Sequence, residues 1–293
     1  MFESTTTSYL IYAATVGMFR GILSLIIEHP FDALKTYWQA NLHIKTTKEA
    51  IKKIYKLKGW RGFYSGAIPN AIRLMMKQAY RYPLMLVLPF FFNQFFHSLA
   101  IISALSGVTI AVLEVWIIAP LERLKVWLIT FNHVNGGMSA FFQQARAEKL
   151  EADLDKKHQH RSFLPSFFSF IFRGSKVTIM RQIVSWVTFL VVHEQTIFFF
   201  KTTLGMQEIT FSSLLAISAI EALVNTIAIL PFDEIKTRMQ SVSNKNKMLD
   251  EIRYIYNTRG VKGFYLAYHI RLAQYMIQAC FTVTILEKLK HGF

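Results

Sequence analysis

The sequence predicts an all-α membrane protein in which six transmembrane helices, arranged as three pseudo-symmetric two-helix repeats, surround a central cavity. Three observations lead to this prediction. The 293-residue chain is 53% hydrophobic and only 17% charged, well below the roughly 25% of charged residues in soluble domains. It contains six apolar stretches of spanning length, which is about 20 residues or more. One short charged motif also occurs three times along the chain.

The apolar stretches are separated by segments of very different charge. They cover residues 9–27, 67–92, 99–119, 163–200, 211–230 and 267–286. The segments after the first, third and fifth stretches carry seven, five and five Lys or Arg residues, whereas residues 91–98 carry none. By the positive-inside rule the basic segments share one side of the membrane, so both termini should face the other side. Apolar residues at helical spacing, such as Ile51 and Ile54, predict short surface helices within the basic segments.

The repeated motif is a proline followed by an acid two residues later and a base three residues after the acid. Its copies are Pro30, Asp32 and Lys35; Pro120, Glu122 and Lys125; and Pro231, Asp233 and Lys236. With this composition about 0.05 matches are expected by chance. Three copies, each at the end of an odd-numbered stretch, therefore indicate a triplicated chain. The predicted repeats cover residues 1–98, 99–205 and 206–293 and form one folded unit.

This pattern resembles the mitochondrial carrier family, whose repeats carry Pro-x-Asp/Glu-x-x-Lys/Arg on every odd-numbered helix. The sequences "GFYSGAIPNAIR" and "GFYLAYHIR", which end at Arg73 and Arg271, resemble the family's entry into its even-numbered helices. The resemblance implies an alternating-access transporter of the mitochondrial inner membrane that functions as a monomer, with its termini in the intermembrane space. It also implies a matrix gate of three ion pairs that cross between repeats, braced by Gln39 and Gln240. The implied pairs are Asp32 with Lys125, Glu122 with Lys236, and Asp233 with Lys35.

Polar residues inside the apolar stretches predict the lining of the cavity. Charges within a span face the protein interior or a water-filled space, and the alignment on the prolines places Arg20, Glu114 and Glu221 on one stripe. Across the whole predicted cavity, cations outnumber acids, so the expected ligand is an anion. The cations are Arg20, Arg73, Lys77, Arg81, Arg181 and Arg271, and the acids are Glu28, Glu114 and Glu221. The resemblance adds the family's substrate contact points on the even-numbered helices. The predicted substrate-binding residues are Arg73, Lys77, Arg181, Gln182, Gln274, Tyr275, Arg271 and Arg20.

Two classes of anion stay open. The pair Arg181 and Gln182 resembles the pair found in carriers of carboxylates or keto acids. The excess of cations, with Trp186 or Tyr275 available to stack on a base, favours a nucleotide phosphate such as ATP or ADP, and we place this class slightly ahead. The "RRRMMM" hallmark of the ADP/ATP exchanger is missing from the chain.

The gate on the opposite side is degenerate. The family expects an acid followed three residues later by a base at the end of each even-numbered helix, and this chain retains Glu194, Glu287 and Lys290. Ile197 replaces the base of the second repeat, so this gate should be weak and exchange partly unidirectional. Phe172, Arg173 and Gly174 resemble the family's cardiolipin-binding motif, which predicts one lipid site.

Other functions receive less support. The degenerate gate leaves open a carrier-fold protein that no longer transports and acts as a receptor, insertase component or structural subunit. The sequence contains no arrangement of nucleophile and base that would indicate an enzyme. We also expect neither a cofactor nor a metal site. The chain has a net charge of +15, but it contains none of the aromatic and basic signatures of RNA-binding modules. We therefore expect no nucleic-acid partner. A carrier this divergent is also consistent with a gene from a parasite, or from an intracellular bacterium that targets the protein to host mitochondria.

Overall fold

The computed structural model describes residues 24–131, 137–155, 163–202, 205, 211–241 and 246–278. Within these residues every regular element is a helix, so the all-α prediction is confirmed. In chain order the elements are a first helix over residues 24–40, α2 (Thr47–Lys58), η1 (Gly59–Tyr64), α3 (Ala67–Phe92), α4 (Leu99–Thr130), α5 (Met138–Asp155), α6 (Phe163–Ile171), α7 (Ser175–Thr202), α8 (Phe211–Gln240), α9 (Met248–Arg259), η2 (Gly260–Tyr265) and a last helix over residues 268–278.

Three helical segments among the described residues are long and apolar enough to cross a membrane, namely Ala104–Thr130, Phe167–Thr202 and Ser212–Gln240. These segments belong to α4, to α6 with α7, and to α8. Helix α3 is 26 residues long, but Arg73, Lys77 and Arg81 lower its mean hydropathy. The first and the last of the six predicted spans lie partly outside the described residues.

The prolines of the repeated motif lie inside helices. We expected the third and fifth spans to stop at Pro120 and Pro231, yet α4 and α8 continue for about ten residues beyond them. A proline removes one backbone hydrogen bond and crowds the preceding turn, and a helix can accommodate this by bending. The residues after each proline are buried, as Trp127 and Ile235 show. Packing against neighbouring helices therefore stabilises the continuation that the proline opposes.

The predicted span over residues 163–200 is two helices. Helix α6 ends at Ile171 and α7 begins at Ser175, because Gly174 adopts the left-handed backbone conformation with φ +81°. Gly66 and Ala267 occupy the same position before α3 and before the last helix, with φ +75° and +59°. The entry into each even-numbered helix is therefore built in the same way.

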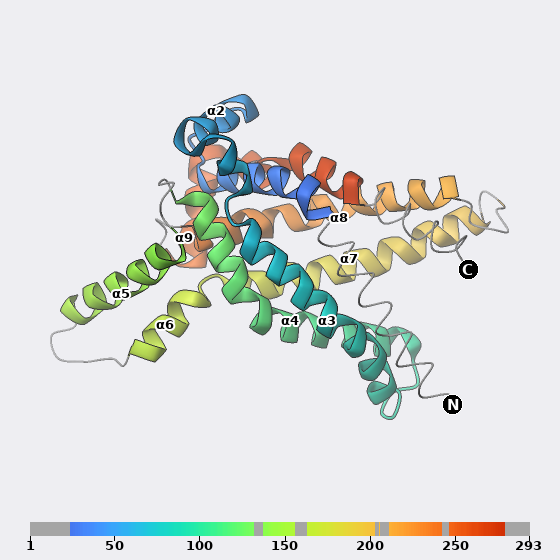
Figure 1. The fold of residues 1–293 in the computed structure, drawn as a ribbon. Helices are drawn as coiled ribbons and strands as arrows, with labels where there is room; N and C mark the ends of the chain where they lie inside the picture. The colour runs from blue at the N-terminus through green and yellow to red at the C-terminus, as the bar shows by residue number, and fades with distance from the viewer. Residues whose placement is uncertain are drawn as a thin grey trace.

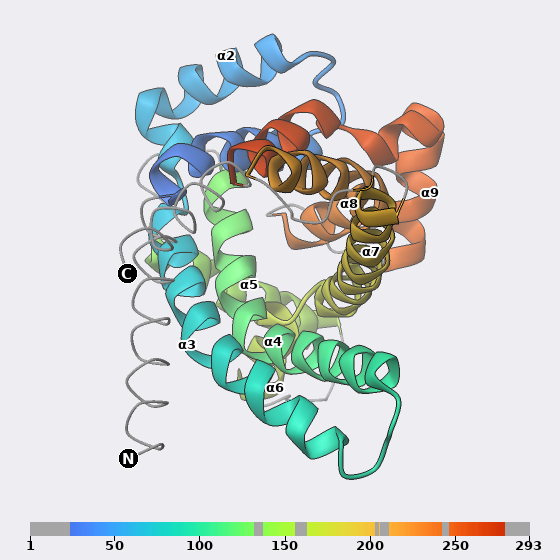
Figure 2. The ribbon, with the colours of Figure 1, turned by 90° about the vertical axis from the view of Figure 1, so that its right-hand side faces the viewer.

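The helices surround a central space (Figures 1 and 2). Helix α4 packs against α3 on one side and α7 on the other, and α7 packs along α8. One hydrophobic cluster joins the first helix, α2, α8 and α9 through residues such as Trp38, Ile54 and Ile255. A second joins α4, α5 and α6 through Trp127, Phe141 and Phe170.

Two of the short surface helices, α2 and α9, connect their own repeat to another. Lys58, the last residue of α2, donates hydrogen bonds from Nζ to the carbonyls of Leu128 (2.8 Å) and Ile129 (3.0 Å) near the end of α4. Burial lowers the pKa of the Lys58 ammonium to about 8. Arg259, the last residue of α9, donates to the carbonyl of Ile44 in the first repeat. These contacts place the basic segments, as the sequence predicted, in surface helices at one end of the bundle.

Candidate functional site: a basic cavity closed by ion pairs

The central space contains a cavity of about 660 Å³. Its described lining comes from the first helix, α3, α4, α7, α8 and the last helix. Among the described residues, seven basic and four acidic side chains line the cavity, which gives this part of the lining an excess of three positive charges. The basic residues are Lys35, Arg73, Lys77, Lys125, Arg181, Lys236 and Arg271, and the acidic residues are Glu28, Asp32, Glu122 and Asp233.

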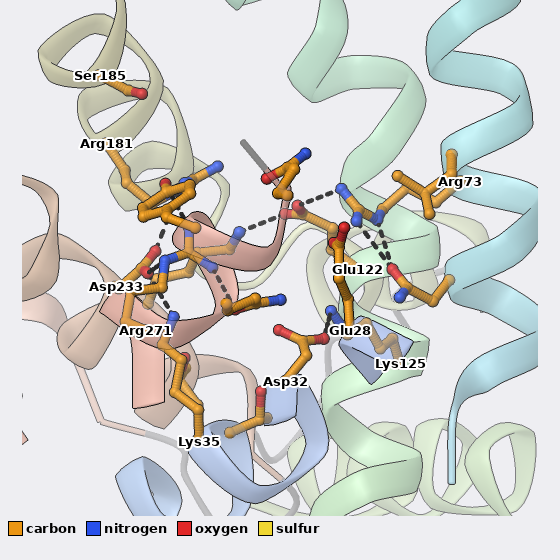
Figure 3. A pocket seen from close by; sticks show the side chains of 18 of the residues that line it. Glu28, Asp32, Lys35, Arg73, Glu122, Lys125, Arg181, Ser185, Asp233 and Arg271 are labelled. Atoms are coloured by element: carbon orange, nitrogen blue, oxygen red, sulfur yellow. Dashed lines mark hydrogen bonds and ion pairs between the residues drawn. The ribbon is translucent and has the colours of Figure 1, made fainter. Parts of the chain in front are cut away.

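One end of the cavity is closed by ion pairs between the three motif helices (Figure 3). The Nζ atom of Lys35 lies 2.5 Å from Oδ2 of Asp233, and that of Lys236 lies 2.5 Å from Oε2 of Glu122. Lys125 pairs with Asp32. All six side chains are buried. These are the three pairings that the family resemblance implied, and each joins two different repeats.

Three arginines of the cavity share the gate carboxylates, which the sequence did not predict. Arg73 of α3 lies 3.6 Å from Glu122, Arg181 of α7 lies 3.4 Å from Asp233, and Arg271 of the last helix lies 3.6 Å from Asp233. Each of these two carboxylates therefore faces a lysine of the gate and at least one arginine of the cavity. The predicted substrate contacts and the predicted gate form one charge cluster.

The predicted substrate contacts of the third repeat form a compact group around Arg271. Its guanidinium donates to the hydroxyl of Tyr275 (2.8 Å) and to Oε1 of Gln274 (3.1 Å). The guanidinium carbon also lies 4.4 Å from the centre of the Tyr275 ring, a cation–π distance. These contacts orient Arg271 toward Asp233.

Lys77 and Gln182 meet at Glu114 rather than standing alone in the cavity. The Nζ atom of Lys77 lies 2.7 Å from Oε1 of Glu114, and Nε2 of Gln182 donates to the same oxygen at 3.4 Å. Glu114 is only 1% exposed. This acid, which the sequence placed on the cavity stripe, neutralises one of the lining cations.

The two predicted brace residues occupy different environments. Gln39 accepts a hydrogen bond from Thr237 of the third repeat at 3.2 Å. Gln240 is fully buried, but its side-chain amide has no hydrogen-bond partner within the described part of the chain. Its backbone carbonyl accepts from Arg123 of α4, and Gly174 packs against its side chain. Both residues thus lie at contacts between repeats.

The opposite gate is largely outside the described residues. Glu287 and Lys290 are not described, and of Glu194 only the helical backbone is. Arg20, which was predicted as a substrate contact, also lies outside the described residues. His193, next to Glu194, contacts Glu221 of α8, with 2.6 Å between Nδ1 and Oε1. Glu221 lies on the predicted cavity stripe, but the sequence contains no signal that pairs it with His193.

The predicted lipid motif is partly engaged by the protein. Arg173 pairs with Glu148 of α5 and lies over the Phe170 ring, 5.5 Å from its centre. Phe172 contacts the Trp116 ring, with 5.3 Å between centroids. The lipid site stays a prediction.

This helical bundle and its gated basic cavity define a membrane carrier. The family model described as "Mitochondrial carrier protein" matches residues 6–85 and 207–293, more than half of the chain. The chain therefore belongs to the mitochondrial carrier family, whose members transport metabolites across the mitochondrial inner membrane.

Relatives within the family have different named cargoes. The chain is 24% identical over 268 residues to the mitochondrial carnitine carrier of Saccharomyces cerevisiae, a match that covers 84% of this chain and 76% of that carrier. It is 38% identical over 62 residues to the mitochondrial thiamine pyrophosphate carrier 1 of Saccharomyces cerevisiae, which is 20% of each protein. It is 38% identical over 64 residues to the human mitochondrial glycine transporter, 22% of this chain and 21% of that protein. The last two matches span about a fifth of each relative.

Proposed function

We propose that this carrier transports an anionic metabolite by alternating access, with a nucleotide or another phosphate ester slightly ahead of a di- or tricarboxylate or keto acid. The observation that carries the proposal is the set of three cavity arginines that face the gate carboxylates. Arginine presents a planar fork of donors that matches phosphate and carboxylate oxygens. An anion that reaches the cavity therefore meets the donors that now face Glu122 and Asp233.

Because the cavity arginines and the gate lysines face the same carboxylates, a bound anion can affect the gate. Arg73, Arg181 and Arg271 lie 3.4 to 3.6 Å from their acids, whereas the gate lysines lie closer. An anion that draws an arginine away changes the charge balance around the carboxylate that the gate lysine holds. A ligand shifts a two-state equilibrium only by its differential affinity for the two states. The arginines supply this difference, since they contact the gate in the closed state and the anion when it is bound.

The choice between phosphate and carboxylate rests on charge and aromatic lining. An excess of three charges in the lining, reduced to about two by Glu114, suits an anion of two or three charges. Trp186, Phe189 and Tyr275 also line the cavity, and stacking of a base on an aromatic ring contributes about 1 to 3 kcal/mol. Nucleotides and thiamine pyrophosphate have both features, whereas small carboxylates have only the charge.

Thermal stabilisation of the purified carrier tests the substrate class. The panel comprises ATP, ADP, thiamine pyrophosphate, citrate, 2-oxoglutarate, carnitine and glycine. A ligand at 100 times its Kd adds about 2.7 kcal/mol of stability, so we expect a clear rise in Tm with the phosphate esters. A shift with citrate or 2-oxoglutarate alone would overturn the phosphate preference. The absence of a shift with every anion would overturn the proposal of anion transport.

We further propose that the closed end of the cavity faces the matrix and that the monomer is the functional unit, as the family resemblance implies. The weak opposite gate should permit uptake into liposomes that contain no counter-substrate. Strict one-for-one exchange in that assay would contradict a weak gate.

A non-transporting receptor or structural role has one observation in its favour, namely Ile197 in place of the expected base. The three complete ion pairs of the matrix gate support transport instead. Lack of uptake for every compound of the panel, in protein that remains folded, would favour the non-transporting role.

A further inference from the structure

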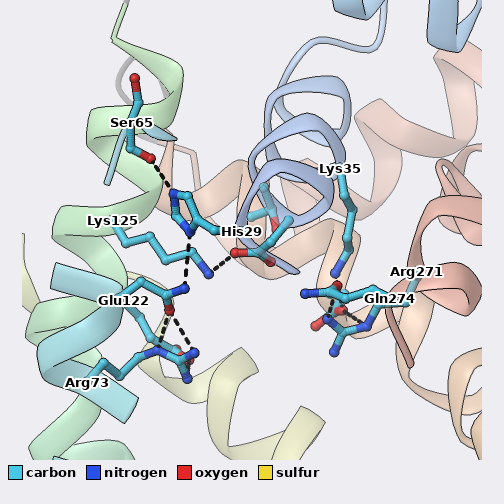
Figure 4. Close-up of polar contacts among 12 residues, drawn as sticks. His29, Lys35, Ser65, Arg73, Glu122, Lys125, Arg271 and Gln274 are labelled. Atoms are coloured by element: carbon cyan, nitrogen blue, oxygen red, sulfur yellow. Dashed lines mark hydrogen bonds and ion pairs between the residues drawn. The ribbon is translucent and has the colours of Figure 1, made fainter. Parts of the chain in front are cut away.

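A chain of buried polar groups connects the first helix to the substrate contact Arg73 (Figure 4). His29 is 1% exposed and Asn70 is 5% exposed. Nε2 of His29 lies 3.0 Å from the carbonyl oxygen of Ser65, and Nδ1 lies 3.2 Å from Nδ2 of Asn70. Oδ1 of Asn70 accepts from Nε (3.1 Å) and Nη2 (2.8 Å) of Arg73. Nη1 of Arg73 in turn faces Glu122 of the gate.

The chemistry of these groups determines the direction of every hydrogen bond. The guanidinium of Arg73 can only donate, so the oxygen of the Asn70 amide must face it. The amide nitrogen therefore faces His29 and donates to Nδ1, which must be unprotonated. The remaining ring proton lies on Nε2, where the carbonyl of Ser65 accepts it. The arrangement is satisfied only by a neutral His29.

This chain of groups is specific to the first repeat. The position of Asn70 has an equivalent in each of the other repeats, namely Thr178 and Arg271. The backbone N–H of each donates the first hydrogen bond of its even-numbered helix, and the acceptors are the carbonyls of Gly66, Gly174 and Ala267 respectively. The residues equivalent to His29 are Ala119 and Leu230, which also directly precede their prolines. Two repeats thus build the same turn without a histidine or an asparagine. The turn does not require these residues, so they serve another purpose in the first repeat.

We propose that His29 is a proton-binding site that controls Arg73 through Asn70, so that the anion binds together with a proton. This inference rests on the proposed function of Arg73 as an anion contact. A proton taken up from water forms an N–H bond at Nδ1, which then no longer accepts from Asn70. The Asn70 amide turns by half a rotation to present its oxygen to His29, and no bond in it breaks. Its NH₂ group now faces Arg73, which loses the acceptor of two hydrogen bonds and becomes available to the anion.

Charged groups on three helices surround His29. Among the described residues they are Asp32 on its own helix, Arg73 on α3 and Lys125 on α4. The Tyr64 ring of η1 stacks on it at 6.2 Å. Lys125 already pairs with Asp32, so a protonated His29 adds a positive charge next to Arg73. This charge repels the guanidinium and attracts an anion in the cavity.

The test measures anion affinity as a function of pH in the full-length carrier. Sulfate and 2-oxoglutarate serve as probes because their own charges stay constant from about pH 5.5 to about pH 8, the range in which histidine titrates. We expect the Kd of wild type, measured by thermal-shift titration, to fall about tenfold toward the acidic end of this range. The reason is that protonation of His29 frees Arg73 from two charge-assisted hydrogen bonds to Asn70. His29→Gln retains a donor and an acceptor but does not titrate, and its Kd should be independent of pH. Thr178→Ala, at the equivalent position of the second repeat, is the matched control and should behave as wild type.

Asn70→Ala separates control through the amide from a simple effect of charge. The proposal expects its Kd to lose most of the pH dependence, so that only the direct effect of the His29 charge is left. A pH dependence that persists in His29→Gln would overturn the proton site. A pH dependence that persists undiminished in Asn70→Ala but disappears in His29→Gln would overturn the role of the amide. If neither probe binds to wild type at any pH while the phosphate esters stabilise it, the proton proposal fails and anion transport stands. If no anion binds at all, both fail.

Discussion

At the scale of single residues, the cavity is defined by two carboxylates that each face a lysine and at least one arginine. The family resemblance implied the lysine partners of Asp233 and Glu122. It could not predict the arginine partners. Helical register shows that Arg73 and Arg181 lie at one level of the cavity, but the side-chain path toward the gate depends on distances between helices.

Arg181 should be essential for transport but not for folding. Arg181→Ala removes the guanidinium that faces Asp233, while the Lys35 pair still neutralises this acid. We expect uptake to fall to background and the far-ultraviolet circular dichroism to stay unchanged. Arg146→Ala, on the exposed face of α5, is the control and should transport as wild type. Normal uptake by Arg181→Ala would remove this residue from the site.

At the scale of elements, the gate pairs join neighbouring helices and differ in how replaceable they are. Asp233 faces Lys35 and two arginines, whereas the one ion pair that the structure records for Asp32 is with Lys125. The sequence treats the three pairs as equivalent copies, so this asymmetry required the structure.

Charge exchange across the gate should expose that asymmetry. Each single charge reversal leaves buried charges unpaired and should cost about 3 to 5 kcal/mol. Asp32→Lys combined with Lys125→Asp restores an opposite-charge pair and should recover most of the stability and uptake. Lys35→Asp combined with Asp233→Lys places a lysine beside Arg181 and Arg271 and should recover neither. Equal recovery of both exchanges, measured by Tm and uptake, would argue against shared carboxylates.

The entries into the even-numbered helices provide a second test at this scale. Gly66 and Ala267 both have positive φ, a conformation that costs an L-residue about 1 to 2 kcal/mol. A Cβ at Gly66 would also lie 2.9 Å from the backbone oxygen of Lys125. Gly66→Ala should therefore lower Tm strongly, whereas Ala267→Gly should raise it or leave it unchanged. A higher Tm for Gly66→Ala would contradict the close packing of the repeats.

Much of the element pattern could be predicted from the sequence, with two instructive errors. Apolar length and basic segments predicted the spans and the surface helices, because both depend on composition over many residues. The ends of α4 and α8 were placed too early, since packing after Pro120 and Pro231 outweighs the local cost of a proline. The single span over residues 163–200 is interrupted by one backbone conformation at Gly174, and a hydropathy pattern does not reveal a φ angle.

At the scale of the whole molecule, the three repeats form a ring in which each contributes acids, lysines and arginines to one cavity. The shared gate carboxylates are a property of the assembled ring, since Asp233 faces side chains from all three repeats. The sequence predicted the ring from internal repetition and the positive lining from its cations, but the volume of the cavity needed the assembled structure. The central claim is that the gate opens for an anion that takes over the shared arginines.

Uptake of radiolabelled ATP and thiamine pyrophosphate into liposomes that contain the purified full-length carrier tests this claim most directly. The account predicts saturable uptake of at least one of these anions, inhibition by the unlabelled compound, and loss of uptake in both Arg73→Gln and Arg181→Gln. Retained uptake in the two arginine variants would contradict it, as would a folded wild-type carrier that takes up no anion.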